Sequence, residues 1–348
     1  ADKAQCLQGA ALSQHNRHPC CFHSRPRTMA ISHHLKDIGR GKEGARSLDR
    51  TQAADLLGQV LDGTASDLEV GAFCIAMRVK GETPEEMAGF LDAIHQRLPR
   101  LAAPERPLVV LPSYNGARKL PLLTPLLALL LARQGLCVLV HGSATEERRA
   151  SSADVLAHLG VAPQIVLQTP PPGSMAYAPT ALLLPGLERL LQVRRVLGLR
   201  NSAHSLVKLL DPLAPVGARS IVVGSYTHPE YAQSMAATCA LTGACALLLR
   251  GTEGEPVADA RRTPRMVLVN DGVAQCVQEA QVGPLTSLPR VPTIIDAATA
   301  ADFPRAVMEG RLPAPAPVTL QVEHIVRACK ALEAAYDPTL LQPLVTPA

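Results

Sequence analysis

Residues 108–140, LVVLPSYNGARKLPLLTPLLALLLARQGLCVLV, decide the fold class of this 348-residue chain. The apolar run at 108–111 is short and rich in branched residues, which predicts a buried strand. A loop at 112–119 follows, then a helical pattern at 122–134 and a second apolar run at 137–140. A strand, a loop, a helix and a strand in this order predict a βαβ unit. Open α/β folds of this kind bind ligands where the first strand ends and the helix begins.

Helical patterns lie on both sides of this unit. Before it, apolar residues at helix spacing predict helices at 53–61, 67–79 and 84–98. The residues expected to face inward in the second of these helices are Leu68, Ala72, Ile75 and Ala76. Thr83 followed by Pro84 and two glutamates is typical of a capped helix start, so it predicts where the third helix begins.

The second half of the chain mixes both patterns. Residues 181–210 return to helix, and further strands are expected at 221–223, 246–249 and 266–269, with a last helix from about residue 319. The predicted fold class is therefore α/β, with a small all-helical domain made of two chain segments beside a large α/β domain. The predicted bounds are 1–29 for a disordered extension, 30–103 and 175–210 for the helical domain, and 107–174 and 211–348 for the α/β domain.

The loop at 112–119 is the first candidate binding site. A helix N-terminus after a strand favours anions. However, a phosphate cradle needs several glycines so that backbone amides can approach the oxygens, and only Gly116 is present. Arg118 and Lys119 therefore suggest contact with a polyanion through side chains, while the alternative is a surface turn with two solvated cations.

Three further positions could contact a ligand. Ser151 and Ser152 precede a helix, where they could bind phosphate or act as ordinary N-caps. His141 ends the second strand and could be a packed strand-end residue. Arg200 lies in a turn between helices, where it could bind a carboxylate or phosphate or could satisfy helix C-terminal carbonyls. The glycine-rich turn at 250–256 carries two acids, but Mg²⁺ held by one or two carboxylates needs phosphates alongside.

Charge is concentrated near the N-terminus. Residues 1–50 carry nine Lys or Arg against four acids, a net +5, so the remainder of the +4 chain sums to −1. A basic segment on a near-neutral body predicts an anionic partner. Because aromatic residues make up only 3% of the chain, base stacking is expected to contribute little, with Tyr114 as the main stacking candidate.

The nine cysteines are scattered and form no C-x-x-C pair, which is typical of buried thiols in a reducing cytosol. An alternative is a zinc site built from N-terminal ligand types, namely His15, His18, Cys20, Cys21 and His23. No apolar run is long enough for a membrane span and no secretory signal is evident, so a cytoplasmic protein with no membrane partner is expected. Met29 is a candidate natural start, with residues 1–28 as an upstream extension.

Five stretches, at 36–42, 112–119, 200–204, 228–231 and 251–255, resemble the YbiB-type branch of the anthranilate phosphoribosyltransferase superfamily, glycosyltransferase family 3. The resemblance runs from about Lys36 to Ala335. It implies the nucleoside phosphorylase/phosphoribosyltransferase-like fold, a homodimer formed through the helical domain, and sequence-tolerant binding of nucleic acid.

The chain departs from the transferase pattern of that superfamily. Residues 112–116 stand where transferases have a Gly-Thr-Gly-Gly-Asp loop for the donor diphosphate, and Ser143 replaces the Asn of a His-Gly-Asn turn. The metal-binding Asp-Glu pair falls near Pro256 and Val257, which cannot bind a metal through their side chains. Arg200 matches an arginine that contacts the acceptor, anthranilate. Part of the acceptor site is thus expected to survive, and the donor-diphosphate site is not.

The predicted function is therefore sequence-tolerant binding of DNA or RNA and not transfer of a sugar, and no catalytic residue, metal or cofactor is expected. The predicted nucleic-acid contacts are Lys36, Arg40, Lys42, Arg46, Arg118, Lys119, Arg148, Arg149, Arg194 and Arg195. The predicted vestigial substrate cleft comprises Ser113, Tyr114, Asn115, Gly116, His141, Ser151, Ser152 and Arg200. The alternative is a glycosyl or phosphoribosyl transferase with an altered donor or acceptor, which would use Mg²⁺.

Overall fold

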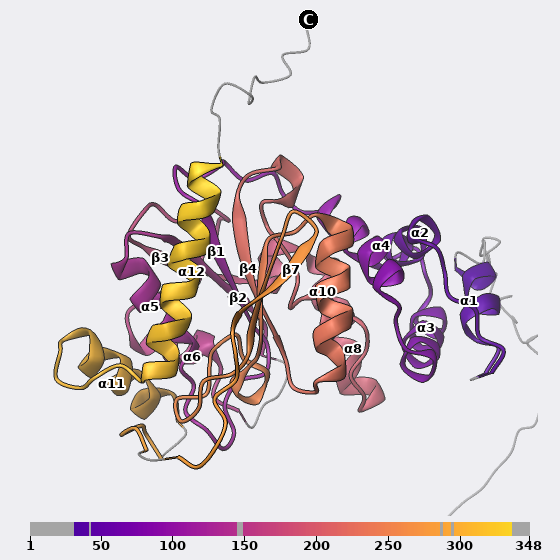
Figure 1. Cartoon of the computed structure of the whole chain (residues 1–348). Helices are drawn as coiled ribbons and strands as arrows, with labels where there is room; N and C mark the ends of the chain where they lie inside the picture. The colour runs from indigo at the N-terminus through magenta and orange to yellow at the C-terminus, as the bar shows by residue number, and fades with distance from the viewer. Residues whose placement is uncertain (1–30, 42, 145–148, 286–287, 294–295, 336–348) are drawn as a thin grey trace, which may run out of the picture.

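The computed structural model describes residues 31–335, apart from residues 42, 145–148, 286–287 and 294–295. It contains a small helical part and a large α/β part (Figure 1), which confirms the predicted fold class. The helices are α1 (Ser32–Ile38), α2 (Arg50–Leu61), α3 (Asp67–Lys80), α4 (Pro84–His95), α5 (Thr124–Arg133), α6 (Ser152–His158), α7 (Thr180–Leu183), α8 (Pro185–Leu197), α9 (Ala203–Leu206), α10 (Glu230–Thr242), α11 (Ala297–Met308) and α12 (Ala316–Ala334). None of these helices is long and apolar enough to cross a bilayer.

One sheet organises the α/β part. Its strands are β1 (Leu108–Ser113), β2 (Cys137–Gly142), β3 (Met175–Pro179), β4 (Ser220–Tyr226), β5 (Ala246–Arg250), β6 (Met266–Asn270) and β7 (Val273–Gln278). They lie in the order β3-β2-β1-β4-β5-β6-β7. The first five are mutually parallel, and β6 and β7 add an antiparallel edge. The loops that follow β1, β2, β4 and β5 therefore emerge at the same edge of the sheet.

Strand β3 corrects one predicted domain bound. Residues 175–210 were expected in the helical domain, but Met175 pairs with Val138 and Tyr177 with Val140, so 175–179 belong to the sheet. Pairing with β2 outweighs the local pattern there, which is short and rich in alanine. Residues 180–206 are helical, as α7, α8 and α9, with breaks at Leu184 and in the turn at 198–202.

The central strands are buried on both faces and separate two cores. Val109, Val138 and Ile221 point to one face of the sheet. There they share a core with Leu126 of α5 and Ile325 of α12. The alternate residues of the same strands face α10 and the helical part: Leu108, Val110, Leu139 and Val222. Burial on both sides explains why these strands read as continuous apolar runs.

Local signals set the starts of three helices in the helical part. Asp49, Ser66 and Thr83 each cap a helix through a reciprocal hydrogen bond with the third helical residue. The predicted cap at Thr83, with Pro84 at the first helical position, is confirmed. Of the cysteines in the described residues, Cys74, Cys137, Cys239 and Cys329 are buried free thiols, and Cys245 and Cys276 are half-buried.

The inward face predicted for α3 is wrong for Leu68, Ala72 and Ile75, which are exposed, whereas Ala76 is half-buried against the core. Leu68 is 84% exposed, Ile75 40% and Val79 59%, whereas Phe73, Cys74 and Met77 are buried. Phe73 packs edge-on against Phe90 of α4, with 5.9 Å between ring centroids. Helix α3 is apolar on two sides, so its sequence period alone does not show which side packs inward. The exposed side borders a groove of about 470 Å³ that is also lined by Leu35 and Ile38 of α1.

Candidate functional site

The carboxylate of Glu255 lies at the centre of the loop that follows β1. It is 1% exposed. The backbone N–H groups of Asn115 and Gly116 each donate to its Oε1 at 2.8 Å. The hydroxyl of Ser113 donates to Oε2, and that of Thr124 donates to the same oxygen at 3.0 Å. These four donors supply the hydrogen bonds that a buried carboxylate requires.

A second carboxylate, that of Glu253, binds the next part of the same loop. It accepts the backbone N–H groups of Arg118 at 2.8 Å, Lys119 at 3.1 Å and Leu120 at 3.2 Å. Burial raises the pKa of Glu253, but the three N–H groups together lower it by more than burial raises it. The pKa of Glu253 therefore lies below its usual range. Its φ of 52° is in the left-handed region, which costs about 1–2 kcal/mol for a residue with a side chain. The three hydrogen bonds offset that cost.

The loop therefore binds anions through backbone amides, and these anions belong to the chain itself. The sequence predicted no amide cradle because only one glycine is present, and this part of the prediction is wrong. Gly116, with φ of 65°, supplies the one left-handed position that the loop needs. A Cβ there would lie 2.6 Å from the carbonyl oxygen of Ala150. Sequential N–H groups then converge on Glu253 and Glu255 as they would on a phosphate.

Little space remains beside the two carboxylates. Asn115 Nδ2 donates to the carbonyl of Glu253 at 2.8 Å, and a Cβ on Gly254 would lie 1.8 Å from the same Nδ2. The hollow lined by Ser113, Asn115, Ser152 and their neighbours measures about 10 Å³. That is room for about one water molecule. This hollow is too small to hold a sugar diphosphate.

The two predicted serines have different roles. Ser152 Oγ lies 2.7 Å from Ser113 Oγ. Since the Ser113 proton goes to Glu255, Ser152 is the donor of this pair and extends the network. Ser151 caps α6 by accepting the N–H of Asp154 at 3.1 Å, so the ordinary N-cap interpretation is confirmed for it.

Tyr114 and His141 form a separate buried pair. The Tyr114 hydroxyl lies 2.8 Å from His141 Nδ1 and accepts the Thr180 hydroxyl at 2.8 Å. Tyr114 is only 4% exposed, so the prediction that it stacks on bases is wrong. Burial lowers the pKa of His141 to about 3, which keeps the imidazole neutral. His141 is thus the packed strand-end residue that the sequence suggested.

A larger cleft lies on the other side of the 251–255 turn. It measures about 330 Å³, and Arg78, Arg200, His204 and Lys208 are among its lining residues. Arg78 Nη1 donates to the carbonyl of Arg200 at 3.4 Å, and Lys208 Nζ donates to that of Gly254 at 3.2 Å. Lys208 thus links the cleft to the turn that carries Glu253 and Glu255.

The charges in this cleft favour an anion. Burial, followed by the charge of Arg200, lowers the pKa of Lys208 to about 8, so its amine stays protonated at neutral pH. Burial and the same arginine lower the pKa of His204 to about 4. Three cationic side chains then face the acid Glu82, whose Oε1 accepts the Ser202 hydroxyl at 2.5 Å.

Of these cleft cations the sequence singled out only Arg200. Arg78 lies in the last turn of α3, where a basic residue is ordinary. Lys208 lies in an apolar stretch with no motif around it. Neither residue carried a local signal that could have marked it as part of a site.

The predicted nucleic-acid contacts do not form one cluster in the described residues. Lys36 is exposed on α1, Arg40 and Arg46 are exposed in the segment that follows it, and Arg118 and Lys119 are exposed at the amide loop. Arg149 donates to the carbonyl of Asn115 at 3.3 Å, so it joins the loop group. Arg194 and Arg195 end α8, and Arg195 donates to the carbonyl of Ala144 at 3.5 Å. Lys42, Arg148 and the N-terminal histidines and cysteines lie outside the described residues.

Sequence comparison identifies relatives over most of the chain. Residues 33–97 match the helical bundle domain of the glycosyl transferase family. The Escherichia coli protein named "Uncharacterized protein YbiB" is 36% identical over 297 residues, which cover 83% of this chain and 91% of that protein. The anthranilate phosphoribosyltransferase of Anaeromyxobacter dehalogenans is 33% identical over 202 residues, which cover 56% of this chain and 58% of the enzyme.

Solved structures share the fold. The anthranilate phosphoribosyltransferase of Thermus thermophilus superposes with a TM-score of 0.68 at 22% identity, covering 87% of this chain and 90% of the enzyme. The Saccharomyces cerevisiae enzyme in complex with PRPP and Mg gives a TM-score of 0.60 at 15% identity, covering 83% and 85%. The arrangement of a helical part beside a mixed sheet is thus that of these enzymes.

Proposed function

This chain belongs to the YbiB family and has the fold of the anthranilate phosphoribosyltransferases, and on that premise we propose that it binds nucleic acid through its phosphates. The observation that carries the proposal is the occupation of the amide loop by Glu253 and Glu255. The amides that would hold a donor diphosphate are already bound to carboxylates. Contacts to the phosphates of a nucleic acid would then be made by side chains at the surface.

Exposed cations at the rim of the loop suit that role. Arg118 and Lys119 donate their backbone N–H groups inward to Glu253, while their side chains are exposed. Lys36, Arg40 and Arg46 add charge on the helical part. Arginine and lysine contacts to phosphates give affinity that depends on salt and little on sequence. The partner proposed is single-stranded DNA or RNA, met in the cytoplasm, with no cofactor required.

Titration of labelled single-stranded DNA at several salt concentrations tests this function. We expect the logarithm of the affinity to fall linearly with the logarithm of the salt concentration, by about 0.7 for each phosphate contact. The variant Arg118→Glu/Lys119→Glu should bind more weakly on every sequence. The matched control is Arg327→Glu/Lys330→Glu, which reverses two exposed charges on α12. Absence of binding at low salt, or a flat response to salt, would defeat the proposal.

The second candidate function is glycosyl or phosphoribosyl transfer, and the comparisons favour it. The named enzymes among the relatives and solved structures cited above are anthranilate phosphoribosyltransferases. The cationic cleft with Arg78, Arg200 and Lys208 also suits a small anionic acceptor. A donor diphosphate would first have to displace Glu255 from four hydrogen bonds. Calorimetry with phosphoribosyl pyrophosphate and Mg²⁺ discriminates, because a saturable heat that requires the metal would establish the transferase and reject the first function's premise.

We also propose that the exposed side of α3 is covered by a second copy of the chain. Leu68, Ile75 and Val79 are apolar and exposed, and Ile75 and Val79 line the groove of about 470 Å³ next to α1. Contiguous apolar surface of this kind is costly to leave in water. A dimer formed here would use the helical part, as the resemblance to the superfamily implied.

A further inference from the structure

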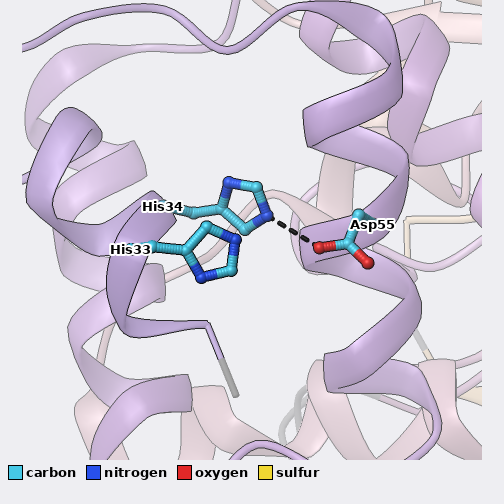
Figure 2. Close-up of side chains that lie close together, drawn as sticks. All are labelled: His33, His34 and Asp55. Carbon is cyan, nitrogen blue, oxygen red and sulfur yellow. Dashed lines mark hydrogen bonds and ion pairs between the residues drawn. The ribbon is translucent and has the colours of Figure 1, made fainter. Parts of the chain in front are cut away.

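Two helices of the helical part bring together three side chains that commonly bind metal. His33 and His34 belong to α1, and Asp55 lies on the facing side of α2 (Figure 2). One ligand atom from each residue lies within 4.8 Å of the other two. We propose that His33, His34 and Asp55 bind a divalent transition metal, and that zinc is the ion that fits best.

The donor set supports this choice. Imidazole nitrogen and carboxylate oxygen are ordinary zinc ligands at about 2.0–2.2 Å, and a site with three protein ligands takes water as the fourth. Mg²⁺ and Ca²⁺ suit the site less well than zinc, because they prefer oxygen ligands and two of the three ligands are imidazole nitrogens. The sequence singled out none of these three residues, because His33 and His34 are separated from Asp55 by 21 or more positions.

The three ligand atoms are close enough for one ion to contact all of them after small side-chain adjustments. His34 Nε2 lies 2.8 Å from Asp55 Oδ2, a hydrogen-bond distance that must widen by roughly 0.5 Å to admit the ion. The side chain of Asp55 is 52% exposed and His33 is exposed, so both can adjust. His34, at 5% exposure, is held in place by its surroundings.

A further residue orients the carboxylate. Gln59 Nε2, one turn along α2, donates to Asp55 Oδ2 at 2.8 Å. Hydrogen bonds of this kind commonly orient metal-binding carboxylates. The simpler role for the cluster is a hydrogen bond between His34 and Asp55 that joins α1 to α2. That role does not involve His33, whose ring nevertheless lies 3.9 Å from the His34 ring, centroid to centroid.

The difference between the two roles makes His33→Ala the decisive variant. It removes one metal ligand and leaves the hydrogen bond from His34 to Asp55 intact. His158→Ala is the matched control, because His158 is also an exposed helix histidine and lies on α6 in the α/β part. The N-terminal ligand types compete for zinc, so all variants are made in a full-length chain that carries His15→Ala, His18→Ala, Cys20→Ser, Cys21→Ser and His23→Ala.

Zinc affinity is measured against a chromophoric chelator, and thermal unfolding is followed with and without zinc. We expect one zinc per chain in the N-terminally substituted background and in the His158→Ala control, with a melting temperature that rises with zinc concentration. His33→Ala should weaken binding at least about 10-fold and abolish the rise. Cobalt absorption should show no sulfur-to-metal charge-transfer band.

Three outcomes would each overturn the proposal. These are zinc binding that disappears with the N-terminal substitutions, an affinity that His33→Ala leaves unchanged, and a cobalt spectrum with thiolate character. None of these measurements depends on nucleic acid or on transferase activity, so the zinc site stands or falls separately from the proposed function.

Discussion

Replacing Glu255 by alanine tests whether the amide loop is an anion site filled by the chain itself. The change removes the acceptor of four hydrogen bonds, from the N–H groups of Asn115 and Gly116 and from the hydroxyls of Ser113 and Thr124. Hydrogen bonds to a charged group contribute about 1.5–3 kcal/mol each, and water entering the vacated space restores about half of the total. We therefore expect the free energy of unfolding to fall by about 3–6 kcal/mol.

The isosteric change Glu255→Gln separates charge from shape. The glutamine carbonyl can accept the two N–H groups, and its amide can donate to the two hydroxyls once these rotate. Because the hydrogen bonds survive without the charge, we expect a smaller loss of roughly 1–2 kcal/mol. Urea unfolding with an unchanged m value measures both losses, with Glu309→Ala as the control for an exposed glutamate.

The same variant should acquire an anion site. In Glu255→Ala the two N–H groups and two hydroxyls are free to bind pyrophosphate, which should raise the melting temperature in a concentration-dependent way. The native chain should show no such rise, because Glu255 occupies the donors. The reasoning is refuted if Glu255→Ala costs less than about 1 kcal/mol, or if pyrophosphate stabilises the native chain and the variant equally.

Three further predictions concern surface charge, assembly and pH. In Arg118→Glu/Lys119→Glu the slope of the salt dependence of single-stranded DNA binding should become shallower by about 1.4, as expected for two lost phosphate contacts; an unchanged slope would show that the binding site lies elsewhere. Ile75→Glu should convert a dimer to a monomer in sedimentation experiments while the circular dichroism spectrum stays native, and a native chain that sediments as a monomer would contradict this. Burial lowers the pKa of His204 to about 4. Between pH 6.5 and 4 the unfolded chain therefore binds a proton at this histidine that the folded chain does not bind. The free energy of unfolding should fall as the pH falls through that window. Urea unfolding at a series of pH values should show a shallower fall for His204→Gln, and an unaltered pH dependence would refute the assignment.

The fold class could be predicted because its signals are local. The βαβ unit from β1 to β2 is set by two apolar runs with a helix between them, and the starts of α2, α3 and α4 by residues within one turn. Strand β3 was missed because five residues without an apolar alternation form a strand only when a partner strand supplies the hydrogen bonds. The side of α3 that packs inward was also missed, since both sides of the helix are apolar.

The sequence by itself determined that the loop after β1 carries one glycine and two cations, since Gly116, Arg118 and Lys119 are close together in the chain. Only the tertiary structure decided which anion the loop holds. Glu255 lies 140 residues after Asn115 and reaches it because β1, β4 and β5 are neighbouring parallel strands whose carboxyl ends share one edge of the sheet. No spacing along the chain records that proximity, and the same holds for the approach of His33 and His34 to Asp55.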